Sequence, residues 1–369
     1  MLYPKYNHNY SFRDFEYMLK GLNKDYSAPL ENLVKTIFRV KYVCFLDSGR
    51  AVISAILHHL NFPDKSEIMV PVNVCDAVVK SITSNNLKAV TIDINENLTL
   101  DTKDIRKKIT PNTKAIISVH TFGIVPNSSE ILSIAKENKI RVIDDLCQSL
   151  PITKNKENEY ITDLCGVLSL DITKPISAFG GGVLLTDNKN LFEKVNPQVQ
   201  ENKFQDFRRF LNFIIFPLLT NSFFYTFVTS KLMENIKELS IYDPSKIKLS
   251  SVGISLFYSQ LLKVKINHKS RKYNVLNFIK SLKGKCDFFV KTNKLNNSLL
   301  FFAIKIKNPR YVSHKLKEKI IHLPRESPLL DNSCPKAKII YKNLLILPTY
   351  QGIEKINEKI CRVIVNEIS

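Results

Sequence analysis

Two short stretches of the chain decide its fold, and both contain residues that can do chemistry. Residues 142–149 read VIDDLCQS, and residues 169–182 read SLDITKPISAFGGG. In the first, two acids close a strand that reads as buried, and a glutamine follows. In the second, a serine and a lysine flank a tight connection that leads into three glycines, which allow a turn or a close approach of backbone. A single acid or lysine of this kind is most often a solvated surface residue. The functional interpretation therefore rests on the order in which these residues follow one another along the chain.

Around these stretches, apolar strands alternate with amphipathic helices. This alternation predicts an α/β fold with a mostly parallel sheet flanked by helices on both faces. Ligands of such sheets bind beyond the carboxyl ends of the strands, where Ser48, His120, Asp145 and Lys174 fall. Strands are expected at 42–46, 67–72, 88–94, 114–122, 141–146, 166–172 and 181–187, and helices at 28–40, 50–60, 75–85, 99–109 and 128–139.

The pattern changes after residue 240. A long helical stretch at 251–283 is followed by short strands near 288–292, 299–306 and 344–348 and by a last helix at 353–367. We therefore expect a large domain over residues 1–240, with an apolar insertion-like segment around 202–235. A smaller C-terminal α+β domain is expected over residues 241–369.

The composition is globular, with a large excess of positive charge. The 369 residues are 44% hydrophobic and 24% charged, which excludes a disordered or collagen-like chain. Lys and Arg outnumber Asp and Glu by 54 to 34, a formal net charge of +20. Such a charge favours nucleic acid, an anionic membrane face or phosphorylated small molecules as partners. Because no RNA-binding aromatic motif or zinc-finger spacing accompanies it, we expect no nucleic acid partner.

Cysteine usage points to a reducing compartment. The seven cysteines are odd in number and form no CxxC pair, so neither a disulfide framework nor a metal site is expected. The first residues, MLYPKYNHNY, lack the apolar core of a signal peptide. These features predict a cytoplasmic protein.

An uncharged stretch at residues 210–230, FLNFIIFPLLTNSFFYTFVTS, complicates this prediction. Its length could span a bilayer, but the Asn, Ser and Pro residues inside it weaken that interpretation. Two others stay open. The stretch is a hairpin packed against a neighbouring subunit, or it is a patch on the inner membrane face with aromatic residues at the interface.

As an ordered set, several blocks resemble the DegT/DnrJ/StrS family of sugar aminotransferases, which depend on pyridoxal 5'-phosphate (PLP) and have the fold type I of aspartate aminotransferase. The resemblance covers residues 28–190 well and 245–369 loosely. It implies a homodimer that moves an amino group from an amino acid, with glutamate expected, to a nucleotide-linked keto-sugar for surface polysaccharide or lipopolysaccharide synthesis. The blocks are LDSGRAV, VTIDINENLTLD, ITPNTKAIISVHTFG, IAKENKIRVIDDLCQS and SLDITKPISAFGGGVLLTD.

The resemblance also implies a role for individual residues. Lys174 aligns with the lysine that forms the Schiff base with PLP and transfers the substrate proton. Asp145 aligns with the acid that keeps the pyridine nitrogen protonated, and Gln148 with the contact to the ring hydroxyl. Ser169 aligns with a phosphate-binding serine. The phosphate is also expected at the turn formed by Ser48 and Gly49, where a helix begins.

Four positions depart from the family pattern or have an open role. Arg50 replaces a threonine and could contact the phosphate more strongly. Cys75 aligns with the aromatic residue that stacks on the cofactor ring, and its other interpretation is a buried apolar filler. Lys246 aligns near an asparagine that reaches across the dimer. His120 matches a family histidine, but a satisfied core histidine is an equal alternative.

Two further functions stay open beside the aminotransferase. The chain could act at the membrane on a lipid-linked sugar, or it could be a binding or regulatory protein that has lost transamination. Lys174 argues against the dehydratase branch of the family, in which we expect a histidine at this position.

Overall fold

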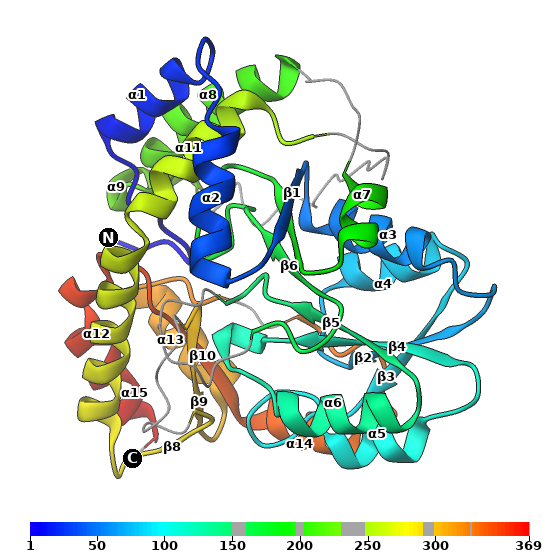
Figure 1. Ribbon diagram of the computed structural model, residues 1–369. Coiled ribbons are helices and arrows are strands. Elements are labelled where there is room, and N and C mark those ends of the chain that lie inside the picture. The colour runs from blue at the N-terminus through cyan, green and yellow to red at the C-terminus, as the bar shows by residue number, and fades with distance from the viewer. Residues whose placement is uncertain (150–159, 197–202, 230–247, 291–298, 325–326, 369) are drawn as a thin grey trace.

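A seven-stranded mixed sheet forms the centre of the protein (Figure 1). The computed structural model describes residues 1–149, 160–196, 203–229, 248–290, 299–324 and 327–368. The strand order is β1-β7-β6-β5-β4-β2-β3, parallel from β6 to β3, whereas β7 is antiparallel to both neighbours. The predicted mostly parallel sheet is thus confirmed. The strands are β1 (Tyr42–Leu46), β2 (Glu67–Pro71), β3 (Lys88–Ile92), β4 (Thr113–Val119), β5 (Arg141–Asp145), β6 (Cys165–Ser169) and β7 (Gly182–Thr186).

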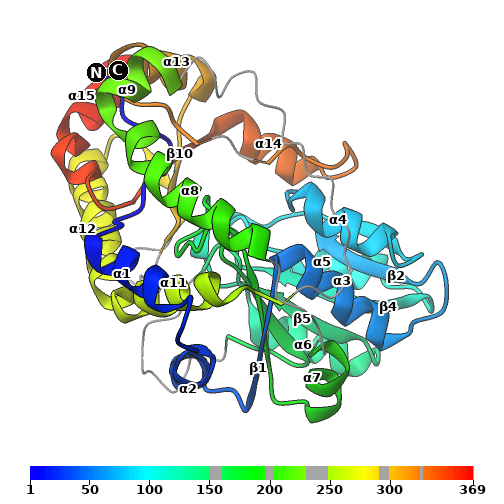
Figure 2. The same cartoon turned by 90° about the horizontal axis from the view of Figure 1, so that it is seen from above.

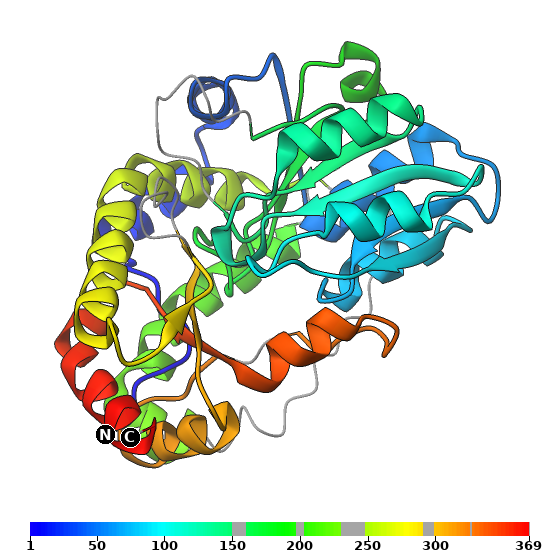
Figure 3. The same ribbon diagram turned by 90° about the horizontal axis from the view of Figure 1, so that it is seen from below.

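Helices cover both faces of this sheet (Figures 2 and 3). One face packs against α3 (Gly49–Leu60), α4 (Asp76–Thr83) and α7 (Lys189–Val195), and the other against α5 (Thr102–Lys108) and α6 (Ser128–Glu137). Successive residues of a strand face opposite sides. In β5, Ile143 packs in the core on the α3 side, and Val142 packs in the core on the α6 side. The same alternation places the next two side chains of β5, Asp144 and Asp145, on opposite faces of the sheet.

A third layer covers the β1 end of the sheet. It consists of α1 (Phe12–Lys20), α2 (Ser27–Phe38) and α11 (Ser251–Leu262), whose apolar residues share one core with Val43, Leu168 and Val183. Two buried positions of α2, Leu30 and Val34, are four residues apart, as expected for an amphipathic helix.

A smaller sheet in the C-terminal part is antiparallel, with the order β10-β9-β8. It packs with long helices over a separate apolar core, which agrees with an α+β unit. The predicted domain boundary between residues 240 and 241 lies outside the described residues and stays a prediction. The elements are α12 (Val264–Leu282), β8 (Asp287–Phe288), β9 (Phe301–Lys305), α13 (Pro309–Lys319), α14 (Pro335–Asn343), β10 (Leu344–Pro348) and α15 (Asn357–Ile368).

The insertion-like segment is helical where it is described. The helix α8 (Lys203–Thr220) is followed by the short α9 (Ser222–Phe224) and a π-helical turn, η2 (Tyr225–Thr229). In Figure 2, α8 runs from the large sheet across the molecule to the end where α13 and α15 lie. In the described part of the chain, no helix is both long enough and apolar enough to cross a membrane.

One side of this helical segment is exposed and apolar. We call it the α8 face. The exposed apolar residues of α8 recur every three or four positions, which places them on one side of the helix. The α8 face consists of Phe204, Phe207, Leu211, Ile214, Ile215, Leu218, Leu219, Phe223, Phe224 and Phe227, each at least 36% exposed.

Candidate functional site

Asp144 and Asp145 end β5, and they face opposite sides of the sheet. Asp144 turns toward Thr162, whose backbone N–H and hydroxyl donate to its two carboxylate oxygens at 2.6 and 3.1 Å. Asp145 lies on the α3 side, where its Oδ1 accepts the N–H of Cys147 at 2.9 Å. Asp144 is therefore held within the fold, and Asp145 is the acid that can serve a ligand on the α3 side.

Gln148 is oriented by the turn after β4. Its side-chain oxygen accepts the backbone N–H of Phe122 at 2.8 Å. Because the oxygen is occupied in this way, the amide nitrogen is the group that can donate to a ligand. Phe122 has a φ of 58°, so this N–H belongs to a turn with an uncommon backbone conformation.

The start of α3 forms a compact cradle with β6 and the glycine run. Ser48 caps α3, and its hydroxyl accepts the N–H of Ala51 at 3.1 Å. A β-carbon at Gly49 would lie 3.0 Å from the Ser169 β-carbon, and one at Gly182 would lie 2.2 Å from the Ser48 carbonyl oxygen. The sequence thus needs glycine at Gly182 for the backbones to meet. The N-terminus of a helix carries partial positive charge, so the cradle can bind an anion.

Lys174 lies on the loop between β6 and β7, within electrostatic reach of Asp171 and Asp145. Burial lowers the pKa of its ammonium, but nearby groups that include the carboxylates of Asp171 and Asp145 raise it, and the net shift is upward. The ammonium is therefore held as a cation by its surroundings. To bond covalently to another group, Lys174 Nζ must first lose a proton, and with it the favourable interaction between its charge and these neighbours.

Side chains from distant parts of the chain bind the carbonyl oxygens of this lysine loop. His8 Nε2 donates to Ile172 at 2.6 Å, and Asn267 donates to Pro175 at 3.0 Å. Tyr10 donates to Ser177 at 3.3 Å, and Arg209 Nε donates to Ala178 at 3.1 Å. The loop that carries Lys174 is thus fixed by the N-terminal segment, α8 and α12. None of these four donors was a predicted site residue, because nothing in their local sequence marks them.

Three other predicted residues are Cys75, Arg50 and Lys246. Cys75 caps α4, is exposed, and lies within electrostatic reach of Lys174 and Cys147. Arg50 is half-buried in the first turn of α3, where its carbonyl accepts the Ser81 hydroxyl at 3.2 Å. Lys246 lies outside the described residues.

His120 faces the Asp144 side of the sheet and is fully buried there. Its Nε2 lies 3.7 Å from Asp144 Oδ1, and its backbone N–H donates to the Asp145 carbonyl at 3.0 Å. This placement favours a core histidine, but not the satisfied one expected, because neither ring nitrogen has a hydrogen-bond partner among the described residues.

Cys147 belongs to the site and was missed by sequence reasoning. It is half-buried between Asp145 and Gln148, and its sulfur lies 3.4 Å from the position of a β-carbon on Gly49. Burial, with Asp145 as the next cause, raises the pKa of its thiol well above the usual range, so the thiol is neutral at pH 7. Its signal was its place inside VIDDLCQS.

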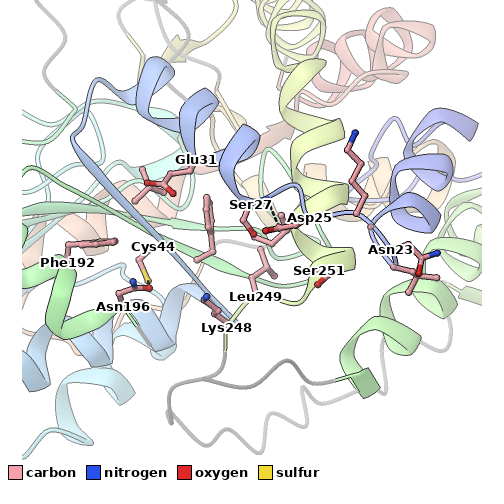
Figure 4. Close-up of a pocket in the computed structure, with 16 residues that line it drawn as sticks. Asn23, Asp25, Ser27, Glu31, Cys44, Phe192, Asn196, Lys248, Leu249 and Ser251 are labelled. Carbon is pink, nitrogen blue, oxygen red and sulfur yellow. Dashed lines mark hydrogen bonds between the residues drawn. The ribbon is translucent and has the colours of Figure 1, made fainter. Parts of the chain in front are cut away.

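A separate pocket of about 460 Å³ lies beside the edge strand β1 (Figure 4). It opens between α2, α7 and α11, and no predicted site residue lines it. Asn196 and Lys248 on its wall adjoin segments outside the described residues. The predicted site and this pocket are thus two different places on the fold.

The residues present fit PLP. A buried carboxylate, a lysine cation and an anion cradle at a helix start share one side of the sheet, which matches a ring nitrogen, an aldehyde and a phosphate. Any side chain at Gly182 would collide with the backbone of Ser48 and Gly49, which forms the cradle.

Comparison with known proteins also identifies aminotransferases as the similar proteins. The sequence profile of the DegT/DnrJ/EryC1/StrS aminotransferase family matches residues 18–366. The 3-oxo-glucose-6-phosphate:glutamate aminotransferase of Bacillus subtilis is 29% identical over 171 residues, 46% of this chain and 38% of that protein. The dTDP-4-amino-4,6-dideoxy-D-glucose transaminase of Shigella dysenteriae is 27% identical over 168 residues, 45% of each chain. The chain thus spans less than half the length of these two relatives.

Among solved structures, Helicobacter pylori PseC, an aminotransferase involved in the biosynthesis of pseudoaminic acid, has a TM-score of 0.79. The match covers 100% of this chain and 99% of that chain at 16% identity. The predicted PLP-transferase fold type I is confirmed by this similarity.

Proposed function

Because the chain belongs to the DegT/DnrJ/EryC1/StrS aminotransferase family, we propose that it is a PLP-dependent aminotransferase that acts on a keto-sugar. The amino group comes from an amino acid, with glutamate as the first choice, and the acceptor sugar is linked to a nucleotide. The product enters surface polysaccharide or lipopolysaccharide synthesis. The observation that carries the proposal is the convergence of Lys174, Asp145 and the start of α3 on one side of the sheet.

Each residue of this site has a role set by its chemistry. Asp145 holds the proton on the pyridine nitrogen, because a buried carboxylate stabilises the adjacent cation. Ser48, Gly49 and Ser169 bind the phosphate at the start of α3. Gln148 donates its amide to the ring hydroxyl, since its oxygen is bound to Phe122.

Lys174 bonds to the cofactor and moves the reacting proton. Bound PLP supplies an electron sink for the electron pair left on the substrate carbon. Lys174 would hold the cofactor aldehyde and, once the substrate amine replaces it there, its neutral Nζ would serve as the base for the substrate α-proton. Bonds from His8, Asn267 and Tyr10 hold the loop so that Nζ keeps its position.

Arg50 and Cys75 adapt this site to its ligands. Arg50 directly follows Gly49 in the first turn of α3, and its fork of donors suits a phosphate. Cys75 lies within electrostatic reach of Lys174 and contacts the cofactor ring with a small polarisable side chain. We keep His120 as a support of β5 and Lys246 as the residue that reaches across a dimer.

The charge of the chain supports a phosphorylated acceptor. A surplus of 20 positive charges attracts a substrate with two phosphates through long-range electrostatics. The two relatives above are named for a sugar phosphate and a dTDP-sugar, so both classes belong in a substrate screen.

We further propose a cytoplasmic homodimer in which the α8 face meets the second subunit. Its large apolar side chains are exposed over several helical turns, and contiguous patches of this kind mark interaction surfaces. Contact with the inner membrane face, and hence action on a lipid-linked sugar, is the second candidate for this surface. A binding or regulatory protein without transamination is the third candidate function.

The test is glutamate-dependent amination of nucleotide keto-sugars and keto-sugar phosphates, followed as release of 2-oxoglutarate. Lys174→Ala should abolish the reaction, and Lys189→Ala, which removes an exposed lysine on α7, should not change it. Full activity of Lys174→Ala would refute the proposed chemistry. A wild-type protein that binds PLP and nucleotide sugars without turnover would favour the binding protein.

A further inference from the structure

Arg209 on α8 is a fully buried arginine in the segment that the sequence assigned to an insertion. Its side chain has no exposed surface. Nε donates to the Ala178 carbonyl at 3.1 Å, and Nη1 donates to the Ser250 hydroxyl at 2.8 Å and to Gln205 Oε1 at 3.2 Å. Nη2 faces Asp47 Oδ1 at 3.7 Å. One guanidinium therefore joins α8 to three other parts of the chain, which contain Ala178, Ser250 and Asp47.

A buried guanidinium is costly unless its donors are paired. Burial lowers the pKa of Arg209 to about 10, against Asp47, which raises it, so the side chain stays charged at neutral pH. Nη2 and Asp47 Oδ1 are the buried members of this group without a hydrogen bond in the described structure. The planar fork of arginine is needed to serve this many partners from one side chain.

Two of the segments joined by Arg209 are the two walls of the anion cradle. Asp47 directly precedes Ser48, the cap of α3. Ala178 lies between Lys174 and the glycine run, where Phe179, Gly180 and Gly181 all have positive φ values of 55°, 116° and 130°. The two glycines adopt such values readily, but a non-glycine residue such as Phe179 keeps one only where surrounding contacts fix it. The Arg209 bond to Ala178 is one such contact.

The wall formed by the glycine run lies close to the Arg209 guanidinium at Gly180 as well. A β-carbon at Gly180 would lie 3.8 Å from Nη2 of Arg209 and 3.9 Å from the Asp47 carbonyl oxygen. Ser48 and Gly181 pair as a β-bridge. The two walls thus meet each other directly, and Arg209 lies at the base of their contact.

We infer that Arg209 is a positioning residue that holds the two walls of the phosphate cradle together and so sets the affinity for the cofactor phosphate. The inference rests on the proposed function, because it takes the cradle as the PLP phosphate site. It also gives the insertion-like helix α8 a role in cofactor binding. Arg209 acts through Asp47 and Ala178 and does not itself touch the ligand.

The test compares the dissociation constants of PLP and of pyridoxal, which lacks the phosphate, for the full chain. Arg209→Lys keeps the charge and removes the fork. We expect PLP binding to weaken about tenfold or more, the effect of losing charged hydrogen bonds, while pyridoxal binding changes less than about twofold. Loss of stability alone would weaken both ligands alike.

Arg271→Lys is the matched control. Arg271 is also buried on a helix, and burial lowers its pKa to about 10. It binds Thr349 and the Leu300 carbonyl, and also Asn267, which holds the Lys174 loop and so affects PLP and pyridoxal alike. This variant should lose stability but keep the ratio of the two dissociation constants.

Ser250→Ala is the second variant, for the case in which Arg209→Lys fails to fold. It removes the 2.8 Å bond and the side-chain cap of α11 and leaves the arginine in place. Loss of the cap weakens both ligands alike, so the ratio should move in the same direction by a smaller factor. An unchanged ratio in the folded variants, with normal PLP binding by the wild type, would overturn the role of Arg209 alone. A wild-type protein that binds neither ligand would overturn the proposed function and this role with it.

Discussion

Gly182 lies directly against Ser48, so close that a β-carbon at Gly182 would stand 2.2 Å from the Ser48 carbonyl oxygen. Gly182→Ala should therefore push β7 away from the start of α3. We expect a loss of about 1–3 kcal/mol in unfolding free energy and a weaker affinity for PLP. Gly284→Ala is the control. Gly284 has a φ of 75° with no atom within 4 Å of the added carbon, so stability should fall and PLP binding should not.

The neighbouring acids Asp144 and Asp145 should differ in what they do. Asp145→Asn should retain the cofactor and lose turnover by about 10²-fold or more, because the ring nitrogen is no longer held protonated. Asp144→Asn should mainly reduce stability, by about 1–3 kcal/mol, since Asp144 binds Thr162. Steady-state kinetics and thermal unfolding of both variants distinguish the two acids. An unchanged rate for Asp145→Asn would show that another acid serves the ring.

His8 should make stability depend on pH in the weakly acid range. Burial lowers its pKa from 6.5 to about 4, with a smaller effect of Arg271 in the same direction, against the Ile172 bond and Asp171, which raise it. The unfolded chain binds this proton near pH 6.5 and the folded chain only near pH 4. The contribution of His8 to stability is thus full above pH 6.5 and falls between pH 6.5 and pH 4.

The measurement is thermal unfolding of the wild type and of His8→Asn over this pH range. Asparagine can donate to the Ile172 carbonyl but does not titrate. The difference between the two melting temperatures should change between pH 6.5 and 4 and be constant above. A constant difference throughout would show that His8 does not change its protonation on unfolding.

The α8 face should control self-association. Phe207→Ser, Ile214→Ser and Leu218→Ser change side chains that are 64%, 58% and 53% exposed, so the fold should be kept. Deletion of residues 210–230 is less clean, because it also removes the buried Phe216 and Tyr225. Sedimentation should show a shift from dimer to monomer. Loss of binding to anionic vesicles, with an unchanged mass, would assign the face to the membrane instead.

Most of the large domain could be predicted from the sequence. Buried strands such as β2 and β7 read as apolar runs, because parallel and central strands are covered on both faces. Capping residues marked helix starts, as Asp101 does for α5. The segment at 210–230 was harder, since its apolar residues point both into the core and outward, and periodicity does not distinguish such a helix from a hairpin.

The site could be predicted only in part. Ser48, Asp145, Gln148, Ser169 and Lys174 stand in local motifs, and the fold brings them to the α3 side of the sheet, but their roles stay predictions. The groups that hold them were missed. His8 binds Ile172 across 164 residues, and Arg209 stood beside an apolar run as one flanking charge. Pairings of this kind come from tertiary packing, which a local pattern does not contain.

The most direct test of the central claim is to find where PLP bonds to the chain. The purified protein would be mixed with PLP, followed by absorbance, reduced with borohydride and mapped by peptide mass spectrometry. We expect a yellow complex and a stable pyridoxyl label on Lys174, with none on the exposed Lys189. A folded protein that gives no such complex, or a label on another lysine, would contradict the assignment of Lys174 as the cofactor-binding residue.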